Sequence, residues 1–245
     1  MTVKEYILDK ISNGTMHLAL LDPDKQSGQV AGEMALRMKA AGTDAILIGG
    51  STGVNPQNIS ETAIAIREMA GLPTIIFPGG PDSISPDVDA LLFMSMMNST
   101  DLVNVIGAQV YAAPIIKKLG IETIPMGYLI IEPGMKVGEV GKAKLVKRDE
   151  IDKAVAYALA CEMYGMSLFY LEAGSGADRP VPVEMISAVK RAISIPLIVG
   201  GGIRTPEAAE AARLAGADII VTGTFIEQCS DDEKLRAVVK ASKGL

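Results

Sequence analysis

The chain has 245 residues, of which 49% are hydrophobic and only 4% aromatic. This length matches the ~250 residues of one complete eight-fold β/α barrel, so we expect a single domain over residues 1–245. The net charge of −6 argues against the broad basic surface that nucleic-acid binding requires. Local backbone N–H groups can still hold a small anion.

Cysteine spacing and hydropathy narrow the class of protein further. Cys161 and Cys229 belong to no C-x-x-C pair, so we expect two buried thiols rather than a zinc site or a disulfide framework. The amino-terminal stretch MTVKEYILDKISNGT lacks an apolar signal core, and no run of ~18 uncharged apolar residues occurs. We therefore expect a cytoplasmic protein without a transmembrane segment.

Short apolar runs alternate with longer amphipathic stretches along the chain, which is the pattern of parallel strands joined by crossover helices. Eight apolar runs predict strands, at 16–21, 44–50, 73–78, 89–95, 122–131, 167–173, 196–202 and 218–224. Helical periodicity is clear in residues 56–70, 102–119, 149–165, 183–193 and 206–215. This order of elements predicts an α/β fold of the (β/α)₈ type, a TIM barrel.

One crossover departs from this pattern. Between the third and fourth predicted strands, the sequence PGGPDSISPDV contains three prolines and two glycines, which cannot form an ordinary covering helix. We predict a modified barrel in which the third outer helix is missing or replaced by an extended strap. The resulting gap would lie beside strands three and four, where Met94, Met96 and Met97 either line a groove or fill the barrel core.

Small residues gather where the last three predicted strands end. Strand six runs into Ala173-Gly174-Ser175-Gly176, strand seven into Gly200-Gly201-Gly202, and strand eight into Thr222-Gly223-Thr224. In β/α barrels the active site lies at the carboxyl ends of the strands, and phosphate commonly docks after strands seven and eight. A role in turns explains any one glycine cluster, but three adjacent clusters indicate backbone N–H groups that approach a phosphate.

The first two predicted strands end in polar side chains. LLDPDK (20–25) closes strand one, and GGSTGV (49–54) closes strand two. A carboxylate beside Ser and Thr hydroxyls suits Mg²⁺, which prefers oxygen ligands and often shares them with substrate phosphates. Asp22 is the principal candidate ligand. Asp24 either joins it or only bonds its own backbone in an Asp-Pro-Asp turn, and a contact of Thr52 with the metal stays open.

Glu172 follows Tyr170 by two positions on the sixth predicted strand, so both side chains point to the same face at the mouth of the barrel. A carboxylate there can orient or deprotonate a substrate hydroxyl. The alternative is a Glu that caps the next helix or pairs with Arg179 or Arg204. His17, the only histidine, lies at the start of strand one, so we expect a structural role and no Ser-His-Asp mechanism.

Residues 136–148 follow strand five and are rich in positive charge. The segment carries Lys136, Lys142, Lys144, Lys147 and Arg148. Lysines on a mobile loop can cover a diphosphate, so this segment is a candidate lid. The alternative is a solvated loop that leads into the next helix.

Five sequence segments together resemble one known family. LLDPDK, GGSTGV, YLEAGSGA, VGGGIRTPEAA and GADIIVTGT occur in this order across the full chain. Their combination closely resembles the archaeal geranylgeranylglyceryl phosphate synthases, prenyltransferases built on a modified TIM barrel. The resemblance implies Mg²⁺-dependent transfer of a geranylgeranyl group from geranylgeranyl diphosphate to the sn-3 hydroxyl of sn-glycerol 1-phosphate. That reaction is the first ether-bond step of archaeal membrane phospholipid biosynthesis.

Carried over residue by residue, the resemblance implies a complete site. Tyr170 and Glu172 would be catalytic, and Mg²⁺ would be held by Asp22 and Ser51. The glycerol phosphate would contact Tyr170, Leu171, Glu172, Ala173, Gly174, Ser175, Gly176, Gly201, Gly202, Gly223 and Thr224. Some relatives have a lysine two positions before the aspartate, where this chain has Leu20, so no role of that lysine is carried over.

Other functions share these features. A related synthase can use a longer, heptaprenyl donor, because one or two side chains along a groove set its depth. A barrel isomerase or lyase of amino-acid biosynthesis has similar phosphate loops, and a non-catalytic sensor of a phosphate ligand belongs to a different class. A continuous apolar groove that reaches the mouth favours prenyl transfer, whereas a closed polar pocket favours the isomerase or lyase. We further expect a homo-oligomer, and a transient contact with a membrane surface for the lipid product.

Overall fold

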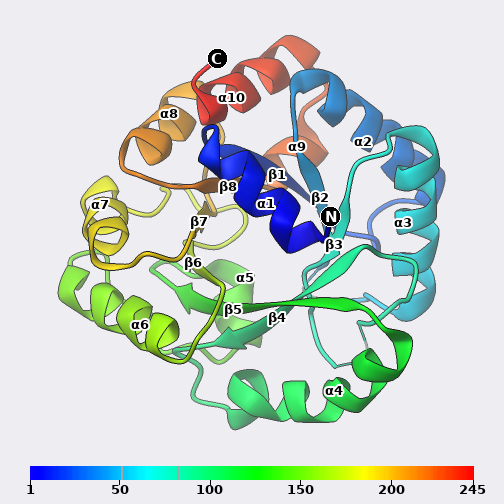
Figure 1. Ribbon diagram of the computed structural model, residues 1–245. Helices are drawn as coiled ribbons and strands as arrows, with labels where there is room; N and C mark the ends of the chain where they lie inside the picture. The colour runs from blue at the N-terminus through cyan, green and yellow to red at the C-terminus, as the bar shows by residue number, and fades with distance from the viewer. Residues whose placement is uncertain (51, 82) are drawn as a thin grey trace.

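The computed structural model describes residues 1–50, 52–81 and 83–245, which form a closed barrel of eight parallel strands (Figure 1). Each strand pairs with its neighbours in the sequence, and β8 pairs with β1. The strands are β1 (Met16–Leu21), β2 (Ala45–Ile48), β3 (Thr74–Ile76), β4 (Ala90–Met96), β5 (Glu122–Ile130), β6 (Leu168–Glu172), β7 (Leu197–Gly200) and β8 (Ile219–Thr222). The eight predicted strands and the TIM-barrel fold are confirmed.

The strands are buried on both faces. Successive side chains of a strand point in opposite directions, so on β1 Met16 and Leu18 point into the barrel, whereas Ala19 and Leu21 point outward to the helices. All four side chains are no more than 2% exposed. This double burial explains why the strands read as continuous apolar runs rather than as alternating ones.

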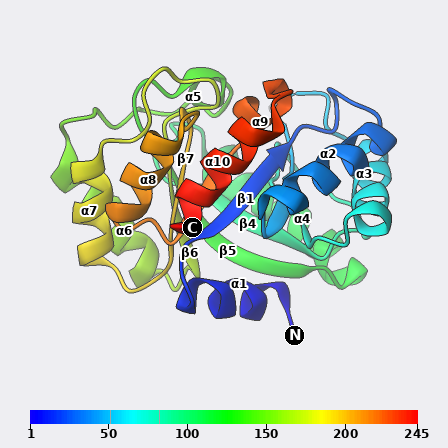
Figure 2. The ribbon, with the colours of Figure 1, turned by 90° about the horizontal axis from the view of Figure 1, so that it is seen from above.

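Helices surround the barrel, and α1 lies across the end where the strands begin (Figure 2). They are α1 (Val3–Ser12), α2 (Gly28–Ala41), α3 (Pro56–Met69), η1 (Val103–Gly107), α4 (Ala108–Leu119), α5 (Met135–Val140), α6 (Ile151–Met163), α7 (Val183–Ala192), α8 (Pro206–Leu214), α9 (Thr224–Gln228) and α10 (Asp232–Lys243). Figure 2 shows α5 and α9 at the opposite end from α1. Among the described residues, no helix combines the length and hydropathy needed to span a bilayer.

Each predicted helical segment contains a helix, but α1, α2, α5, α9 and α10 lie outside those segments. The sequence signal of α2 is weak because small residues form the face that packs on α3. A Cβ at Gly28 would lie 2.7 Å from the backbone oxygen of Glu61, and a Cβ at Gly32 would lie 3.0 Å from that of Ala65. Close backbone contact thus replaces the stripe of large apolar residues that usually reveals a helix.

The crossover from β3 to β4 has no helix in its described residues, 77–81 and 83–89. This strap is held against the barrel by Ile84 and Val88, which are each 8% exposed. It is also fastened to α3, because the side chains of Ser60 and Arg67 donate hydrogen bonds to Asp87. The predicted loss of the third outer helix is therefore confirmed.

Candidate active site

Two adjoining cavities open at the end of the barrel where the strands finish. Leu20, Tyr170, Glu172 and Ser175 line both of them. The smaller cavity lies among the loops that follow β6, β7 and β8. The larger one extends outward between β4, the strap and α4. The mouth of the barrel therefore joins two spaces with different chemistry.

The smaller cavity is built from the loops in which the sequence predicted a phosphate site. Its lining includes Ser175, Gly176, Gly201, Gly202, Gly223 and Thr224. Gly176, Gly201 and Gly202 have φ angles of 84°, 83° and 72°, a conformation that other residues rarely adopt. The hydroxyls of Ser175 and Thr224 lie 2.6 Å apart. A concave surface of backbone and hydroxyl groups without bulky side chains suits a phosphate.

Leu171, Ala173 and Gly174 do not line this cavity, contrary to expectation. Leu171 and Ala173 are completely buried in the layer between the barrel and the helices. They point outward because side chains alternate along β6, and Tyr170 and Glu172 occupy the inward positions. Gly174 instead donates its N–H to Oε1 of Glu172 at 2.6 Å, so its role in the described residues is to hold that carboxylate.

Arg204 lines the smaller cavity, a position that the sequence reasoning missed. The sequence indicated for Arg204 only a pairing with Glu172. Its guanidinium instead donates a hydrogen bond to the backbone oxygen of Gly176. Arg204 follows the glycines of the β7 loop by two positions, and this proximity was the available signal. It adds a cation to the anion site.

Glu172 lies where the two cavities meet and is 6% exposed. Burial raises the pKa of its carboxyl group, and hydrogen bonds from Gly174, Tyr170 and Tyr128 oppose that rise. Among the described residues, Glu172 forms no ion pair with Arg179 or Arg204, and Arg204 donates to the backbone oxygen of Gly176 instead. A buried carboxylate with a raised pKa is suited to accept a proton.

Tyr128 was also missed by the sequence reasoning, although it stands beside Tyr170 in the register of β5 and β6. The rings of Tyr128 and Tyr170 meet edge to face with centroids 5.1 Å apart, and Phe77 completes the cluster at 5.3 Å and 6.0 Å from them. Burial and the neighbouring Glu172 raise the pKa of both phenols well above the usual value. Both hydroxyls therefore stay protonated and can donate to the carboxylate.

Asp22 follows β1 and lies at the mouth, as predicted. Burial raises the pKa of its carboxyl group, and a backbone hydrogen bond from Asp24 and the charge of Lys25 oppose the rise. Oδ1 of Asp22 accepts the N–H of Asp24 at 3.1 Å, and Oδ2 lies 3.7 Å from Nζ of Lys25. A Cβ placed on Gly50 would collide with the Asp22 carboxylate, so the second strand end abuts the first.

The structure describes only some of the other residues that were predicted to contact the metal. Ser51 lies outside the described residues. Thr52 is exposed. The carboxylate of Asp24 lies against Gly53. The described residues contain no group of three or more His, Cys, Asp or Glu side chains arranged to hold a metal ion.

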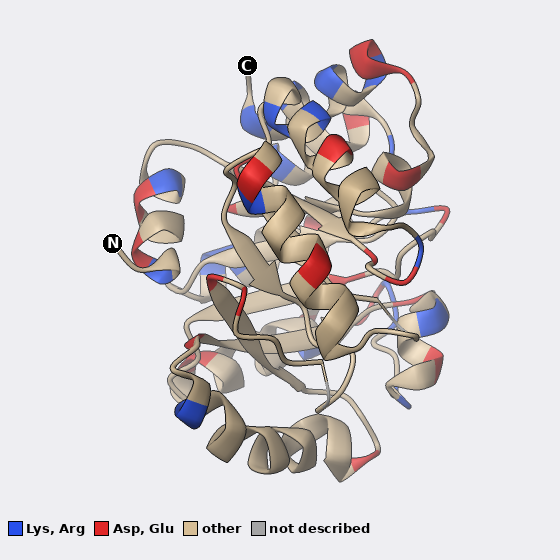
Figure 3. Ribbon diagram, turned by 90° about the vertical axis from the view of Figure 1, so that its right-hand side faces the viewer, with Lys and Arg blue, Asp and Glu red and all other residues tan. Residues whose placement is uncertain are grey.

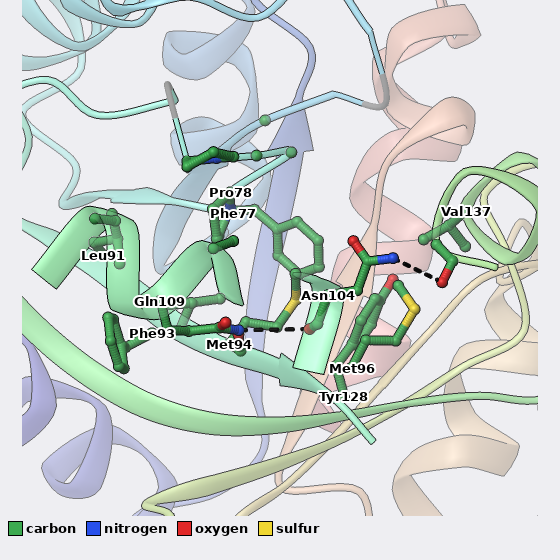
Figure 4. A pocket seen from close by; sticks show the side chains of 18 of the residues that line it. Phe77, Pro78, Leu91, Phe93, Met94, Met96, Asn104, Gln109, Tyr128 and Val137 are labelled. Carbon is green, nitrogen blue, oxygen red and sulfur yellow. Dashed lines mark hydrogen bonds between the residues drawn. The ribbon is translucent and has the colours of Figure 1, made fainter. Parts of the chain in front are cut away.

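The larger cavity is a predominantly apolar groove that reaches from Tyr170 and Glu172 to the strap and α4. Figure 4 shows part of its wall, with Phe77, Pro78 and Leu91 among the labelled side chains. Its lining includes Phe77, Pro78, Ile84, Leu91, Phe93, Ala108, Ala112, Ile116 and Val137. Of the three methionines for which both a groove and a core position were considered, Met94 and Met96 line the groove, whereas Met97 packs against the outer core. The groove exists because no third outer helix fills this space.

Two polar side chains interrupt the apolar wall of the groove. Asn104 donates to the backbone oxygen of Gly141 at 3.0 Å. Gln109 donates through Nε2 to the backbone oxygens of Met94 and Asn104 (Figure 4). Among the described residues, Oε1 of Gln109 is the one buried side-chain oxygen or nitrogen without a hydrogen-bond partner. Exchanging the two amide atoms would set Oε1 against two carbonyl oxygens, so this orientation is the favourable one.

The predicted lid, residues 136–148, forms α5 and a loop beside the groove. Val137, Val140 and Gly141 line the groove. Nζ of Lys142 lies 2.6 Å from Oδ2 of Asp101. These contacts place the segment over the larger cavity, and its movement as a lid stays a prediction.

Residues 9–242 match the PcrB family. The chain belongs to this family. It is 53% identical to geranylgeranylglyceryl phosphate synthase of Thermococcus kodakarensis over 96% of its own length and 93% of that protein. It is 50% identical to the enzyme of the same name from Picrophilus torridus, covering 93% of this chain and 94% of the relative.

A solved structure of a PcrB-like relative has almost the same fold. It is the (S)-3-O-geranylgeranylglyceryl phosphate synthase of Thermoplasma acidophilum in complex with its substrate sn-glycerol-1-phosphate. The TM-score is 0.96, the sequences are 46% identical, and the comparison covers 100% of both chains. The resemblance inferred from the five sequence segments is therefore confirmed.

Proposed function

We propose that the chain transfers a geranylgeranyl group from geranylgeranyl diphosphate to the sn-3 hydroxyl of sn-glycerol 1-phosphate, the first ether bond of archaeal-type membrane phospholipids. One observation carries this proposal: a phosphate-type cavity and an apolar groove meet at the carboxylate of Glu172. The named relatives and the sn-glycerol-1-phosphate complex support the same reaction. A barrel isomerase or lyase would need a closed polar pocket, and the open apolar groove does not favour one.

The acceptor would bind in the smaller cavity. Its phosphate fits the glycine loops, the hydroxyls of Ser175 and Thr224, and Arg204. Its glycerol portion would then reach toward Glu172 at the junction of the cavities. Fixing the hydroxyl at this point lowers the entropic cost of reaction, which is a large part of what such a site contributes.

The donor would lay its prenyl tail in the groove and its diphosphate toward Asp22. The attacking hydroxyl oxygen forms a bond with the first prenyl carbon, the carbon–oxygen bond to the diphosphate breaks, and inorganic diphosphate leaves with the electron pair. Glu172 accepts the hydroxyl proton as that bond forms. Tyr128 and Tyr170, protonated and directed at the carboxylate, keep Glu172 oriented toward the acceptor.

Mg²⁺ fits the residues present at Asp22. This ion is usually held by one or two carboxylates plus substrate phosphates rather than by a cage of protein ligands. The described residues offer that donor set, with the Asp22 carboxylate part-buried beside the cation Lys25. When bound, the metal would neutralise the charge that develops on the departing diphosphate.

The proposed reaction is tested by incubating the protein with sn-glycerol 1-phosphate and a mixture of prenyl diphosphates of different lengths, followed by mass spectrometry. We expect the geranylgeranyl ether of glycerol phosphate as the main product when Mg²⁺ is present. A heptaprenyl ether as the main product would reassign the donor. Binding of glycerol phosphate without any ether product would identify a sensor instead.

Replacing Asp22 tests the metal proposal. Asp22→Ala removes the carboxylate that would hold Mg²⁺, so we expect turnover to fall by at least about 100-fold. Asp9→Ala, exposed on α1 at the opposite end of the barrel, serves as the matched control. Binding of Mn²⁺ in the presence of inorganic diphosphate, followed by electron paramagnetic resonance, should weaken in the first variant. Unchanged turnover and Mn²⁺ binding in Asp22→Ala would contradict the assignment.

We also propose a homo-oligomer, with the outer face of η1 and α4 as the contact surface. Leu102, Val103, Ile106, Val110 and Tyr111 are each at least 54% exposed. Residues 102–121 contain no Asp or Glu, and this region is largely tan in Figure 3. Large exposed apolar patches mark interaction surfaces. A membrane contact that receives the lipid product stays a prediction.

A charge placed on this surface tests the assembly. Val110→Glu puts a carboxylate in the middle of the exposed apolar face, where its desolvation opposes association. We expect the sedimentation coefficient to shift toward that of a monomer in analytical ultracentrifugation. Val183→Glu, at an exposed position on α7, is the matched control. Equal assembly of both variants would show that η1 and α4 do not form the contact.

A further inference from the structure

The short helix α9 connects the smaller cavity to the loop that follows β1. Gly223 and Thr224, at its start, line the smaller cavity. The side chain of Glu227, on the same helix, contacts the loop that carries Asp22. The N–H of Glu227 bonds back to the oxygen of Gly223 at 3.2 Å, so Glu227 is tied to the phosphate loop within one turn. No sequence motif pointed to Glu227.

Glu227 holds the Asp22 loop through both of its carboxylate oxygens. Oε1 accepts the backbone N–H of Asp22 at 3.3 Å, and Oε2 lies 2.6 Å from Nζ of Lys25. The Glu227 side chain is only 13% exposed, so these contacts are partly shielded from water. Lys25 in turn lies 3.7 Å from Oδ2 of Asp22. The three side chains form one network.

The network also sets the charge around Asp22. The inward residue of β1 at this level is Leu20, which lines both cavities and carries no charge. Lys25 is therefore the cation that balances Asp22 and Glu227 among the described contacts. A change in the position of Glu227 would therefore shift the Asp22 loop and also alter the charge around the Asp22 carboxylate.

We propose that Glu227 is a positioning residue that couples the acceptor phosphate site to the donor diphosphate site, and this inference rests on the proposed function. An acceptor phosphate at Gly223 and Thr224 fixes the start of α9 and, through Glu227, fixes Asp22 and Lys25 for the diphosphate. By linkage, a diphosphate beside Asp22 must strengthen acceptor binding by the same factor.

Calorimetry tests the coupling without turnover. The dissociation constant of sn-glycerol 1-phosphate is measured with and without Mg²⁺ and inorganic diphosphate, which occupies the donor site but carries no prenyl group. In the unmodified protein we expect Mg²⁺ and diphosphate to tighten acceptor binding about fivefold or more. Glu227→Ala removes both contacts and should abolish this enhancement. Glu227→Gln keeps an acceptor for the Asp22 N–H and should retain part of it.

Further variants separate positioning from a general structural effect. Glu233→Gln, on the exposed first turn of α10, is the matched control and should keep the full enhancement. Lys25→Met should lose the enhancement as Glu227→Ala does, and it keeps the proposal testable if Glu227→Ala fails to fold. An enhancement in Glu227→Ala equal to that of the unmodified protein, or none in the unmodified protein, would overturn the coupling. Failure of the unmodified protein to bind sn-glycerol 1-phosphate at all would instead overturn the proposed function.

Discussion

The surroundings of Glu172 determine the orientation and the basicity of its carboxylate. It occupies the last position of β6, where the strand points it inward, and Gly174 turns the chain so that its N–H meets Oε1. Gly201 leaves space for this carboxylate, because a Cβ at that position would collide with it. Removal from water raises the pKa of the group, and the phenols of Tyr128 and Tyr170 moderate that rise. The same residue on an exposed loop would be a weaker base.

The pH dependence of catalysis tests this role. The base must be deprotonated to accept the hydroxyl proton, so kcat/KM should fall as the pH is lowered through the raised pKa of Glu172. The acidic limb should therefore lie above the usual glutamate value of about 4.3. Glu172→Gln should reduce kcat/KM by about 10²- to 10⁴-fold and remove this limb. Glu184→Gln, exposed on α7, should change neither quantity. An identical limb in Glu172→Gln would assign the proton to another group.

At the scale of elements, the turn of π-helix before α4 places polar groups in the groove. The helix bonds of η1 join residues five positions apart, so Asn104 and Gln109 lie on the same side instead of diverging as they would in an α-helix. Both side chains consequently line the groove. Oε1 of Gln109 is left without a partner in an otherwise apolar wall. A prenyl chain that passes this oxygen cannot supply a hydrogen bond.

Replacing Gln109 tests how this oxygen affects the fold and the groove. Oε1 is buried without any prenyl donor present, so its cost of about 1–3 kcal/mol falls on the folded protein. Gln109→Met removes that cost but takes the hydrogen-bond donor from the backbone oxygen of Met94, and we expect the two effects to leave the melting temperature nearly unchanged. KM for the prenyl donor should fall, because an apolar side chain then faces the tail. Gln29→Met, exposed on α2, is the control. A higher KM would show that the tail does not pass this position.

At the scale of the whole molecule, one end of the barrel carries the site and the other end is closed. The end where the strands finish holds the loops and cavities, whereas the opposite end is closed by α1, with Ile7 only 1% exposed. His17 belongs to the closed end, as predicted, and its ring nitrogens lie 3.0 Å and 2.9 Å from the hydroxyls of Thr43 and Thr222. Burial lowers the pKa of His17 to about 4. The neighbouring charges of Asp44 and Lys243 affect it less.

This buried histidine predicts a pH-dependent stability. The folded state keeps His17 neutral down to a pH of about 4, whereas the unfolded chain binds a proton near the usual value of 6.5. The unfolded state thus binds more protons between these values, so stability rises with pH across that window, by up to about 3 kcal/mol. Urea denaturation at several pH values should show this slope, and His17→Gln should reduce it. The chain has no other histidine, so equal slopes would exclude the assignment.

Much of the site could be predicted from the sequence because chain position fixes it in a barrel. Strand ends meet at one mouth, so Asp22, Glu172 and the glycine loops were expected together. The side chain of Leu171 faces outward because neighbouring residues on a strand point to opposite faces, so consecutive side chains cannot all line one cavity. Tyr128 and Gln109 were missed because their roles depend on strand register and on a π-helical turn. Neither feature leaves a simple sequence motif.

The alternation of apolar runs and helical periods determined the barrel by itself, because strands buried on both faces need continuous apolar sequence. The prolines and glycines of the strap determined where its ring of helices is open. Only the tertiary structure decided that the opening continues into a groove that ends at Glu172, and that Glu227 reaches Asp22 across the mouth. Such contacts join residues far apart in sequence, and their distances depend on how the whole barrel closes.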